Sequence, residues 1–375
     1  MEPLPPSTRW AIVGAGFAGA ATAWALGRAG LGPGVILEQE FSYGVYASGR
    51  NAALLRLAEA DPILLPLALR SFDRIRAFDR ATAEPLFSET GGLTLAGRES
   101  AAKLEAERDA LQDGGLMTFL LPASDARERF PLLSSVDFHL ALWCPREGVV
   151  DIHALLTRYI QLARKSGFTL VTECSAEDLL IEAGRVTGVR TNRGEIRADG
   201  VIDASGAWAG RLGRAANPLP LRPLRRHLFV SGPPAADITN LPFIWVEDAG
   251  FYFRPEGDGL LFSPCDETHV APGPAATDPA AAELLAEKLT RHAPDFADLP
   301  LKRSWACLRT FAPDRKPVIG PDPDRAGLFH VSGLGGFGMT TSAAIGELAA
   351  TLLAGRTPDW IDLARVLPRR LLSMP

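Results

Sequence analysis

The stretch from Arg9 to Glu40 constrains the fold of this 375-residue chain more than any other. Residues 10–13 are apolar and predict a buried parallel strand, and Gly14, Gly16 and Gly19 follow with the spacing G-x-G-x-x-G. In such a unit the first glycine permits a tight turn, the second lets the backbone approach a pyrophosphate, and the third lets the next helix pack closely on the strand. The phosphates would lie at the N-terminus of that helix.

A second predicted strand, Val35–Glu38, ends on a carboxylate. Glu38 follows the glycines by about 20 residues, where an acidic residue is expected to accept hydrogen bonds from ribose hydroxyls. A chance glycine turn is the alternative, but the alanine-rich helix expected over 20–26 and the second strand favour dinucleotide binding. The candidate contacts in this unit are Gly14, Gly16, Phe17, Ala18, Gly19, Glu38 and Gln39.

Three other stretches of small residues carry further candidates. Residues 46–53 enter a predicted helix that Ser48 could cap, so they are either a site of close backbone approach to a ligand or only a capped helix start. A buried strand over 200–203 runs into small residues and repeats the architecture of the first motif, so the nucleotide-binding domain resumes there. Glycines over 333–341 precede a predicted helix over 342–353, whose amides could face an electron-rich ligand.

The candidate cofactor contacts outside the first unit fall mainly in these three stretches. They are Ser48, Gly49, Arg50, Asn51, Ala52, Ala176, Ala204, Ser205, Gly206, Trp208, Arg309, Gly335, Gly336, Phe337, Gly338, Met339 and Thr340.

Composition argues for a globular protein with a small partner. A length of 375 residues suits two to three domains, and a net charge of −5 without blocks of like charge favours neither nucleic acid nor an acidic membrane surface. Four scattered cysteines indicate no zinc site and no disulfide framework, so we expect no metal and a cytoplasmic location. The apolar run over 10–26 contains the glycine motif, so we expect neither a targeting segment nor a transmembrane helix.

The rest of the chain predicts helices mixed with short strands. Residues 61–103 have a helical pattern that breaks at Gly91-Gly92 into a strand over 93–95. Predicted helices elsewhere cover 99–112, 151–165 and 282–292, and predicted strands cover 138–143, 168–171, 178–182, 186–190, 224–230, 243–262, 305–310 and 328–331.

Taken together, the glycine fingerprint with Glu38 and residues 48–50, 203–208, 305–310 and 333–341 resembles the D-amino-acid oxidase superfamily of flavoproteins. Within it, the chain is similar to the bacterial D-arginine dehydrogenases through residues 49–53, 251–252, 263–264, 308–311 and 335–344. The resemblance implies FAD and an α/β fold. A Rossmann-like (GR2-type) FAD-binding domain over 1–60, 145–215 and 300–375 would be interleaved with an α+β antiparallel-sheet substrate domain over 61–144 and 216–299.

The same resemblance implies oxidative deamination of a D-amino acid. The Cα of the substrate would deliver hydride to flavin N5, and the imino acid would hydrolyse to a 2-oxo acid and ammonia. The acceptor that reoxidises the flavin could be oxygen or a quinone. A secondary-amine oxidase of the sarcosine or glycine type, or a flavin-binding protein without amine turnover, are the alternatives.

Five residues are matched to an active site by this resemblance. Arg309 matches a carboxylate-binding arginine and Tyr252 a tyrosine that meets the same carboxylate. Arg226, beside Arg225, matches a basic pair that lines the site, Gly336 lies in the last glycine cluster, and Tyr46 stands where the D-arginine enzymes have a histidine. Arg309 could instead be an ion-paired structural arginine, Tyr252 an ordinary strand aromatic, and Arg226 a surface arginine.

Two positions bear on chemistry and specificity. Cys307 lies where monomeric sarcosine oxidases carry the cysteine that bonds to the flavin, although a small buried residue in a strand is the simpler interpretation. Gly91-Gly92 stands where an acidic residue would hold the guanidinium of a D-arginine substrate. Because a buried cation without a counter-charge is heavily penalised, we expect a substrate with an uncharged side chain.

Overall fold

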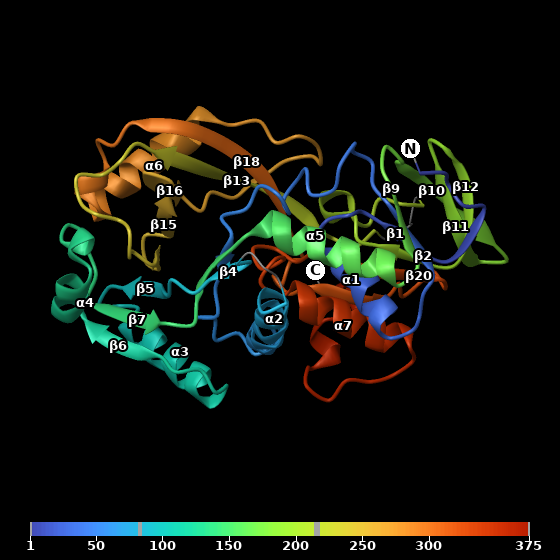
Figure 1. Cartoon of the computed structure of the whole chain (residues 1–375), viewed down its shortest axis with the longest axis horizontal. Helices are drawn as coiled ribbons and strands as arrows, with labels where there is room; N and C mark the ends of the chain where they lie inside the picture. Colours follow the sequence, from blue (N-terminus) through green and yellow to red (C-terminus); the bar gives the residue numbers. More distant parts are fainter. Residues whose placement is uncertain (1, 82–84, 214–217, 374–375) are drawn as a thin grey trace.

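The structure is a computed structural model that describes residues 2–81, 85–213 and 218–373, and it is built around two large sheets (Figure 1). The first sheet has the strand order β10-β11-β12-β1-β2-β9, with β20 paired to β12 and β19 paired to β20. Its central strands β12, β1, β2 and β9 run parallel, as do β12 and β20. The strands of this sheet are β1 (Ser7–Val13), β2 (Gly34–Leu37), β9 (Phe168–Val171), β10 (Ala176–Glu182), β11 (Arg185–Thr191), β12 (Gly194–Asp203), β19 (Val318–Pro321) and β20 (Leu328–Ser332).

Three helices pack together against the first sheet. They are α1 (Phe17–Arg28), α5 (Ile152–Lys165) and α7 (Ser342–Leu353). Buried alanines over most of α1 let the helices approach closely, and a Cβ on Gly346 of α7 would clash with the backbone oxygen of Ala21. The close packing of α1 and α7 therefore depends on small residues on both helices.

The second sheet is mostly antiparallel and has the order β17-β13-β16-β15-β14-β5-β7-β6, with β18 paired to β13. A separate three-stranded sheet has the order β3-β8-β4. The strands of the second sheet are β5 (Gly92–Ala96), β6 (Phe119–Pro122), β7 (Leu140–Cys144), β13 (Arg222–Ser231), β14 (Phe243–Val246), β15 (Phe251–Glu256), β16 (Gly259–Ser263), β17 (Thr268–His269) and β18 (Leu301–Phe311). The small sheet holds β3 (Leu54–Leu55), β4 (Phe87–Ser88) and β8 (Gly148–Val150), and the remaining α-helices are α2 (Leu64–Asp79), α3 (Ala101–Asp113), α4 (Ala123–Arg129) and α6 (Pro279–His292).

The α/β fold class expected from the sequence is confirmed, with a Rossmann-like sheet and a largely antiparallel second sheet. The domain boundaries stay a prediction, and the boundary at 215/216 lies outside the described residues. One strand does not follow the predicted domain division. β18 belongs to the second sheet, although it lies within the 300–375 segment that was predicted for the FAD-binding domain. No helix in the described ranges is long and apolar enough to cross a membrane.

Two local predictions are wrong. Residues 46–53 form turns that lead into β3 rather than entering a helix, because the Asn51 side chain bonds the backbone of Ala47, Ser48 and Ala53. Such side-chain bonds compete with the helical ladder. The helical pattern predicted from residue 61 to the break at Gly91-Gly92 is also too long, since α2 ends at Asp79 and β4 follows, whereas the strand predicted over 93–95 is present as β5.

Candidate active site

A single cavity of about 780 Å³ joins the end of the first sheet to the face of the second. It begins at the C-terminal ends of β1, β2 and β12 and extends to side chains of β13, β14, β15 and β18. In open α/β sheets, ligands bind at this carboxyl edge of the strands. The cavity is therefore placed to hold a nucleotide at one end and a smaller molecule at the other.

The glycine loop forms a cradle, which is the space beside its backbone that side chains at the glycine positions would fill. Gly14 has a φ of 102°, and a Cβ there would lie 2.6 Å from the carbonyl oxygen of Ala204. A Cβ on Gly16 would lie 2.8 Å from Ser48 Oγ. The loop leads directly into α1 at Phe17, so the N-terminus of this helix faces the cavity. The backbone thus provides the close approach that a pyrophosphate needs.

Glu38 lies at the end of β2 and is held by the same loop. Its Oε2 accepts a 3.0 Å hydrogen bond from the Ala15 amide, and its Oε1 accepts one of 3.0 Å from the Glu40 amide. Burial raises the pKa of this carboxyl above its ordinary value. Each carboxylate oxygen has a second lone pair. Glu38 can therefore accept hydrogen bonds from ribose hydroxyls while it orders the glycine loop.

A buried network holds the turn over 203–208 beside the cradle. Asp203 accepts hydrogen bonds from the Ser205 hydroxyl at 2.5 Å and from the Gly210 amide at 2.8 Å. Behind it, His330 Nε2 lies 2.8 Å from Asp322 Oδ2, and His330 Nδ1 lies 3.6 Å from Asp203 Oδ2. His330, to which the sequence assigned no role, therefore supports this wall of the cavity from within the core.

Arg309 and Tyr252 lie at the other end of the cavity with polar atoms that have no partner. Arg309 Nη1 donates a 3.4 Å hydrogen bond to the Gly336 carbonyl oxygen, and its Nε is buried without a partner in the described structure. Tyr252 is 2% exposed, and its hydroxyl also has no partner there. Because buried polar groups are normally hydrogen-bonded, these atoms indicate a ligand with acceptor oxygens.

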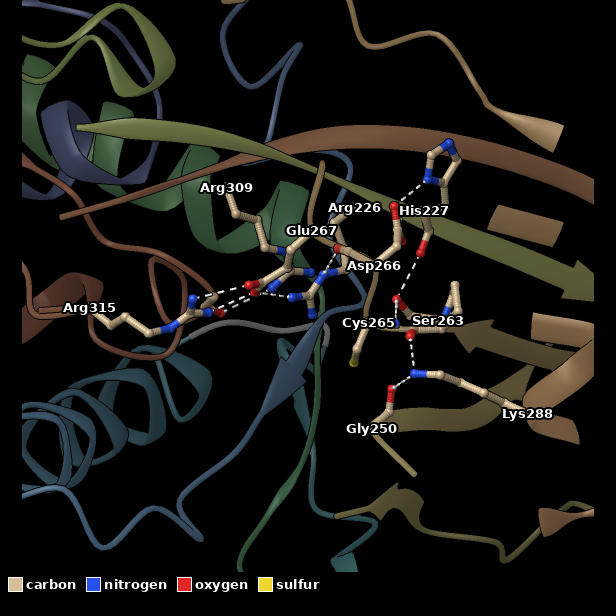
Figure 2. Close-up of polar contacts among 12 residues, drawn as sticks. Arg226, His227, Gly250, Ser263, Cys265, Asp266, Glu267, Lys288, Arg309 and Arg315 are labelled. Carbon is tan, nitrogen blue, oxygen red and sulfur yellow. Dashed lines mark hydrogen bonds and ion pairs between the residues drawn. The ribbon is translucent and has the colours of Figure 1, made fainter. Parts of the chain in front are cut away.

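Arg226 lines the same cavity, but its guanidinium is already paired (Figure 2). Its Nη2 lies 2.6 Å from Glu267 Oε1, and its Nε donates a 3.0 Å hydrogen bond to the Asp266 carbonyl oxygen. Arg315 binds the same carboxylate, with Nη2 2.7 Å from Oε1 and Nη1 3.0 Å from Oε2. The neighbouring Arg225 pairs with Asp278 instead. Of the basic residues matched from the sequence, Arg309 has the donors that are free to bind a substrate.

Tyr46 also lines the cavity, and its hydroxyl is in use. It donates a 2.6 Å hydrogen bond to Glu40 Oε1, and its ring packs against Trp208 at 4.8 Å between centroids. Burial, followed by the hydrogen bond to Glu40, raises the pKa of Tyr46 to about 12. Tyr46 therefore forms part of the cavity wall on the side of Glu40.

The structure brings most of the predicted site residues into one cavity. Gly14, Gly16, Phe17, Ala18, Glu38, Gln39, Ser48, Asn51, Ala52, Ala176, Ala204, Ser205, Gly206, Trp208, Arg309, Gly335, Gly336, Phe337, Gly338, Met339 and Thr340 line it, as do Tyr46, Arg226 and Tyr252. Three candidates lie outside its lining, namely Gly19, Gly49 and Arg50. Gly19 serves packing, because a Cβ there would clash with the carbonyl oxygen of Gly14, and Gly49 likewise packs on Gly44. Arg50 is exposed, so its predicted contact has no support from the cavity geometry.

Sequence reasoning missed several charged and aromatic residues of the wall. They are Arg56, Glu59, Lys103, Glu107, Trp245, Glu247, Cys265, Glu267 and Arg315. These residues belong to no recognisable motif, and the hydrophobic periodicity of α3 or β14 does not distinguish a cavity wall from solvent. Within the described ranges, no group of three or more His, Cys, Asp or Glu side chains could hold a metal ion.

The comparison with protein families decides which kind of protein carries this cavity. The sequence profile of the family described as "FAD dependent oxidoreductase" (DAO) matches residues 9–352. The chain belongs to this family. Its cofactor is FAD, which agrees with the glycine cradle and Glu38.

Similar proteins act on several amines. Glycine oxidase from Pseudomonas aeruginosa is 30% identical over 378 residues, which cover 96% of this chain and 99% of that protein. Mitochondrial sarcosine dehydrogenase from Mus musculus is 24% identical over 95% of this chain, which spans 40% of that longer protein. The chain likewise spans 40% of the length of mitochondrial sarcosine dehydrogenase from Homo sapiens.

Solved structures agree with the fold. L-proline dehydrogenase from P. horikoshii has a TM-score of 0.87 at 22% identity, covering 98% of this chain and 99% of that chain. Glycine oxidase from Geobacillus kaustophilus has a TM-score of 0.82 at 24% identity, covering 97% and 98%. These relatives support the family predicted from the sequence, but they do not specifically support its D-arginine dehydrogenase branch.

Proposed function

We propose that this protein oxidises a small amine that carries a carboxylate, of the glycine or sarcosine type. The observation that carries the proposal is the pair of unpartnered donors at Arg309 and Tyr252, in the same cavity as the glycine cradle. A planar guanidinium suits bidentate binding of a carboxylate, and a phenol hydroxyl can donate to the same group. The glycine and sarcosine enzymes among the similar proteins support this substrate class.

The residues of the chain would bind and orient the two reactants. FAD, when bound, supplies the two-electron oxidation of the C–N bond. The loop at Gly14 and Gly16, with Glu38, would hold its nucleotide part. Arg309 and Tyr252 would hold the substrate carboxylate, which fixes the position of the neighbouring carbon and amine. The imine product would leave the cavity and hydrolyse in water.

D-amino acids with uncharged side chains are a second candidate class. At Gly91 and Gly92 there is no room for an acidic side chain, since a Cβ would clash with Trp143 in the first case and with Glu147 and Phe243 in the second. An acidic residue from this stretch could therefore not bind a substrate guanidinium. This packing favours an uncharged D-amino acid over D-arginine, but it does not favour a D-amino acid over glycine or sarcosine.

Anaerobic reduction of the bound flavin distinguishes these functions. The purified yellow protein is mixed without oxygen with glycine, sarcosine, L-proline, D-methionine, D-phenylalanine or D-arginine, and bleaching is followed by absorbance. We expect glycine or sarcosine to bleach the flavin fastest. Faster bleaching by the uncharged D-amino acids would support the second candidate, and no bleaching by any amine would indicate flavin binding without amine turnover.

The electron acceptor is tested on the same reduced protein. Admission of air, or of a soluble quinone under anaerobic conditions, shows which oxidant restores the yellow colour. Rapid recovery with air would indicate an oxidase, and recovery with the quinone alone would indicate a dehydrogenase.

A further inference from the structure

A second arginine in the cavity has unmet hydrogen-bond donors. Arg56 follows β3 and lines the cavity, and its guanidinium carbon lies 4.2 Å from the ring centre of Trp245. Its Nε is buried, and the described part of the chain gives Arg56 neither a hydrogen bond nor an ion pair. A guanidinium that stacks on an aromatic ring keeps its N–H groups in its own plane, where they can bind a planar anion at the edge.

Glu247, which follows β14 and lines the same cavity, already has two partners. Glu247 forms an ion pair with Lys103 and also accepts a 2.9 Å hydrogen bond from Trp245 Nε1. Each of its oxygens therefore already has one partner, and Arg56 acts on this carboxylate only through its charge. Trp245 is held by this bond, which fixes the ring on which Arg56 stacks.

The carboxylate of Glu147 binds the backbone that directly follows Arg56. Its Oε1 accepts hydrogen bonds from the amides of Leu57 at 2.5 Å and Ala58 at 2.6 Å. This carboxyl is fully buried and does not line the cavity. It therefore fixes the segment after Arg56, and it acts on the guanidinium of Arg56 only through its charge.

Glu107 of α3 is the remaining buried carboxyl of this wall. It is 3% exposed and has an oxygen without a partner. Burial raises its pKa to about 7, although the charge of Arg56 acts in the opposite direction. A carboxyl in this range is partly protonated near neutral pH, so it can donate a hydrogen bond to an anion beside Arg56.

Arg56 is connected to the Arg309 end of the cavity through two stacked rings. Trp245 and Tyr252 are paired across β14 and β15, and their rings stack with centroids 5.2 Å apart and an interplanar angle of 13°. The charge of Arg309 acts on the Tyr252 hydroxyl. One small molecule lying along these rings could therefore reach both guanidinium groups.

We propose that Arg56 binds a second carboxylate, so that the substrate is a dicarboxylic amine with one carboxylate on Arg309 and the other on Arg56. The proposal rests on the proposed function and narrows its substrate class. Iminodiacetate, an N-carboxymethyl amino acid or an acidic amino acid has this chemistry. A substrate with a basic side chain is the alternative, since Glu59, Glu107 and Glu247 also line this wall, but the unpaired charge of Arg56 would repel it.

Ligand binding tests the second site without requiring turnover. The visible spectrum of the oxidised holoenzyme is titrated with malonate, succinate and glutarate, and with acetate as the monocarboxylate. We expect at least one dicarboxylate to bind about tenfold or more tightly than acetate, because a second charge-assisted contact forms. In Arg56→Met, which keeps an unbranched apolar stem on Trp245, this advantage should disappear. Equal affinity of wild type for acetate and all three dicarboxylates would overturn the proposal.

Arg303→Met is the matched control. Arg303 also lies over a tryptophan ring, that of Trp305 at 5.0 Å, but it is exposed and does not line the cavity. It should leave the dicarboxylate advantage unchanged. A loss as large in Arg303→Met as in Arg56→Met would overturn the assignment to Arg56.

Steady-state kinetics then separate this inference from the proposed function. Wild type should have a higher kcat/KM for iminodiacetate or aspartate than for glycine and sarcosine. Arg56→Met should lower kcat/KM for the dicarboxylic amines by about thirtyfold or more and for glycine by about threefold or less. Turnover of glycine without any preference for dicarboxylic amines, or a preference for basic amines, would overturn the inference alone. Tight dicarboxylate binding without amine turnover would overturn the proposed function alone.

Discussion

The Ser48 hydroxyl accepts a 2.9 Å hydrogen bond from the backbone amide of Phe17, 31 residues earlier in the chain. Ser48 therefore caps α1, the helix of the glycine fingerprint, rather than a helix of its own. The same oxygen lies 2.8 Å from the position that a Cβ on Gly16 would occupy. The end of α1 that faces a pyrophosphate is thus shaped from two distant stretches of sequence.

We predict that Gly16→Val gives a protein with little or no bound FAD. The valine side chain would meet Ser48 Oγ and occupy the space through which the backbone approaches the pyrophosphate. Flavin absorbance per protein and far-UV circular dichroism measure the result. A folded, colourless protein is the expected outcome, and a folded variant with a full complement of flavin would show that the pyrophosphate lies elsewhere.

Flavin attachment at Cys307 can be tested directly. This thiol is 3% exposed and lines the cavity. If Cys307 is only a small buried residue, acid precipitation of the protein should release all of the flavin into the supernatant. A yellow pellet that becomes colourless in Cys307→Ala would instead indicate a covalent bond.

Much of the fold could be predicted because its signals are local. Glycines at fixed spacing, buried apolar strands and the final helix over 342–353 all appear in the structure where the sequence places them. Ser48 was assigned to the wrong helix because its partner Phe17 is brought near only by the tertiary fold. Turn residues such as Asn51 resemble a helix start until their side-chain bonds are known.

The cavity wall was less predictable than the cofactor cradle. Arg309 and Tyr252 could be found because they lie in segments that resemble a family. Arg56 and Glu107 lie in a turn and on a helix, and only the packing of α3 against the second sheet brings them to one cavity. Arg226 was predicted as a ligand-binding residue, yet its partner Glu267 is not identifiable from sequence spacing.

We predict a pH-dependent contribution of His330 to stability. Burial alone would lower the pKa of His330, but the carboxylates of Asp203 and Asp322 raise it above its ordinary value. Despite burial, these interactions also lower the pKa of Asp322 and of Asp203. The stabilisation from charged His330 is therefore complete below about pH 6.5 and is lost as pH rises through its raised pKa. The contribution of the carboxylates is lost as pH falls below about 4.

Urea unfolding of His330→Gln between pH 5 and pH 9 measures this effect. The variant should be less stable than wild type by about 3 kcal/mol near pH 5, because it leaves buried carboxylates without their cation, and the difference should shrink toward pH 9. His139→Gln is the control, since His139 is exposed, and it should change stability little at any pH. A stability difference for His330→Gln that does not vary with pH would contradict a charged His330.

The last prediction concerns the carboxylate site itself. A bidentate charge-assisted pair contributes on the order of 3 kcal/mol, so Arg309→Ala should lower kcat/KM for the best amine substrate about a hundredfold or more. Tyr252→Phe removes one neutral hydrogen bond worth roughly 1 kcal/mol and should cost about tenfold or less. Flavin content of each purified variant is the control, and it should stay close to that of wild type. Near-normal kcat/KM in Arg309→Ala, with full flavin content, would show that the substrate carboxylate binds elsewhere in the cavity.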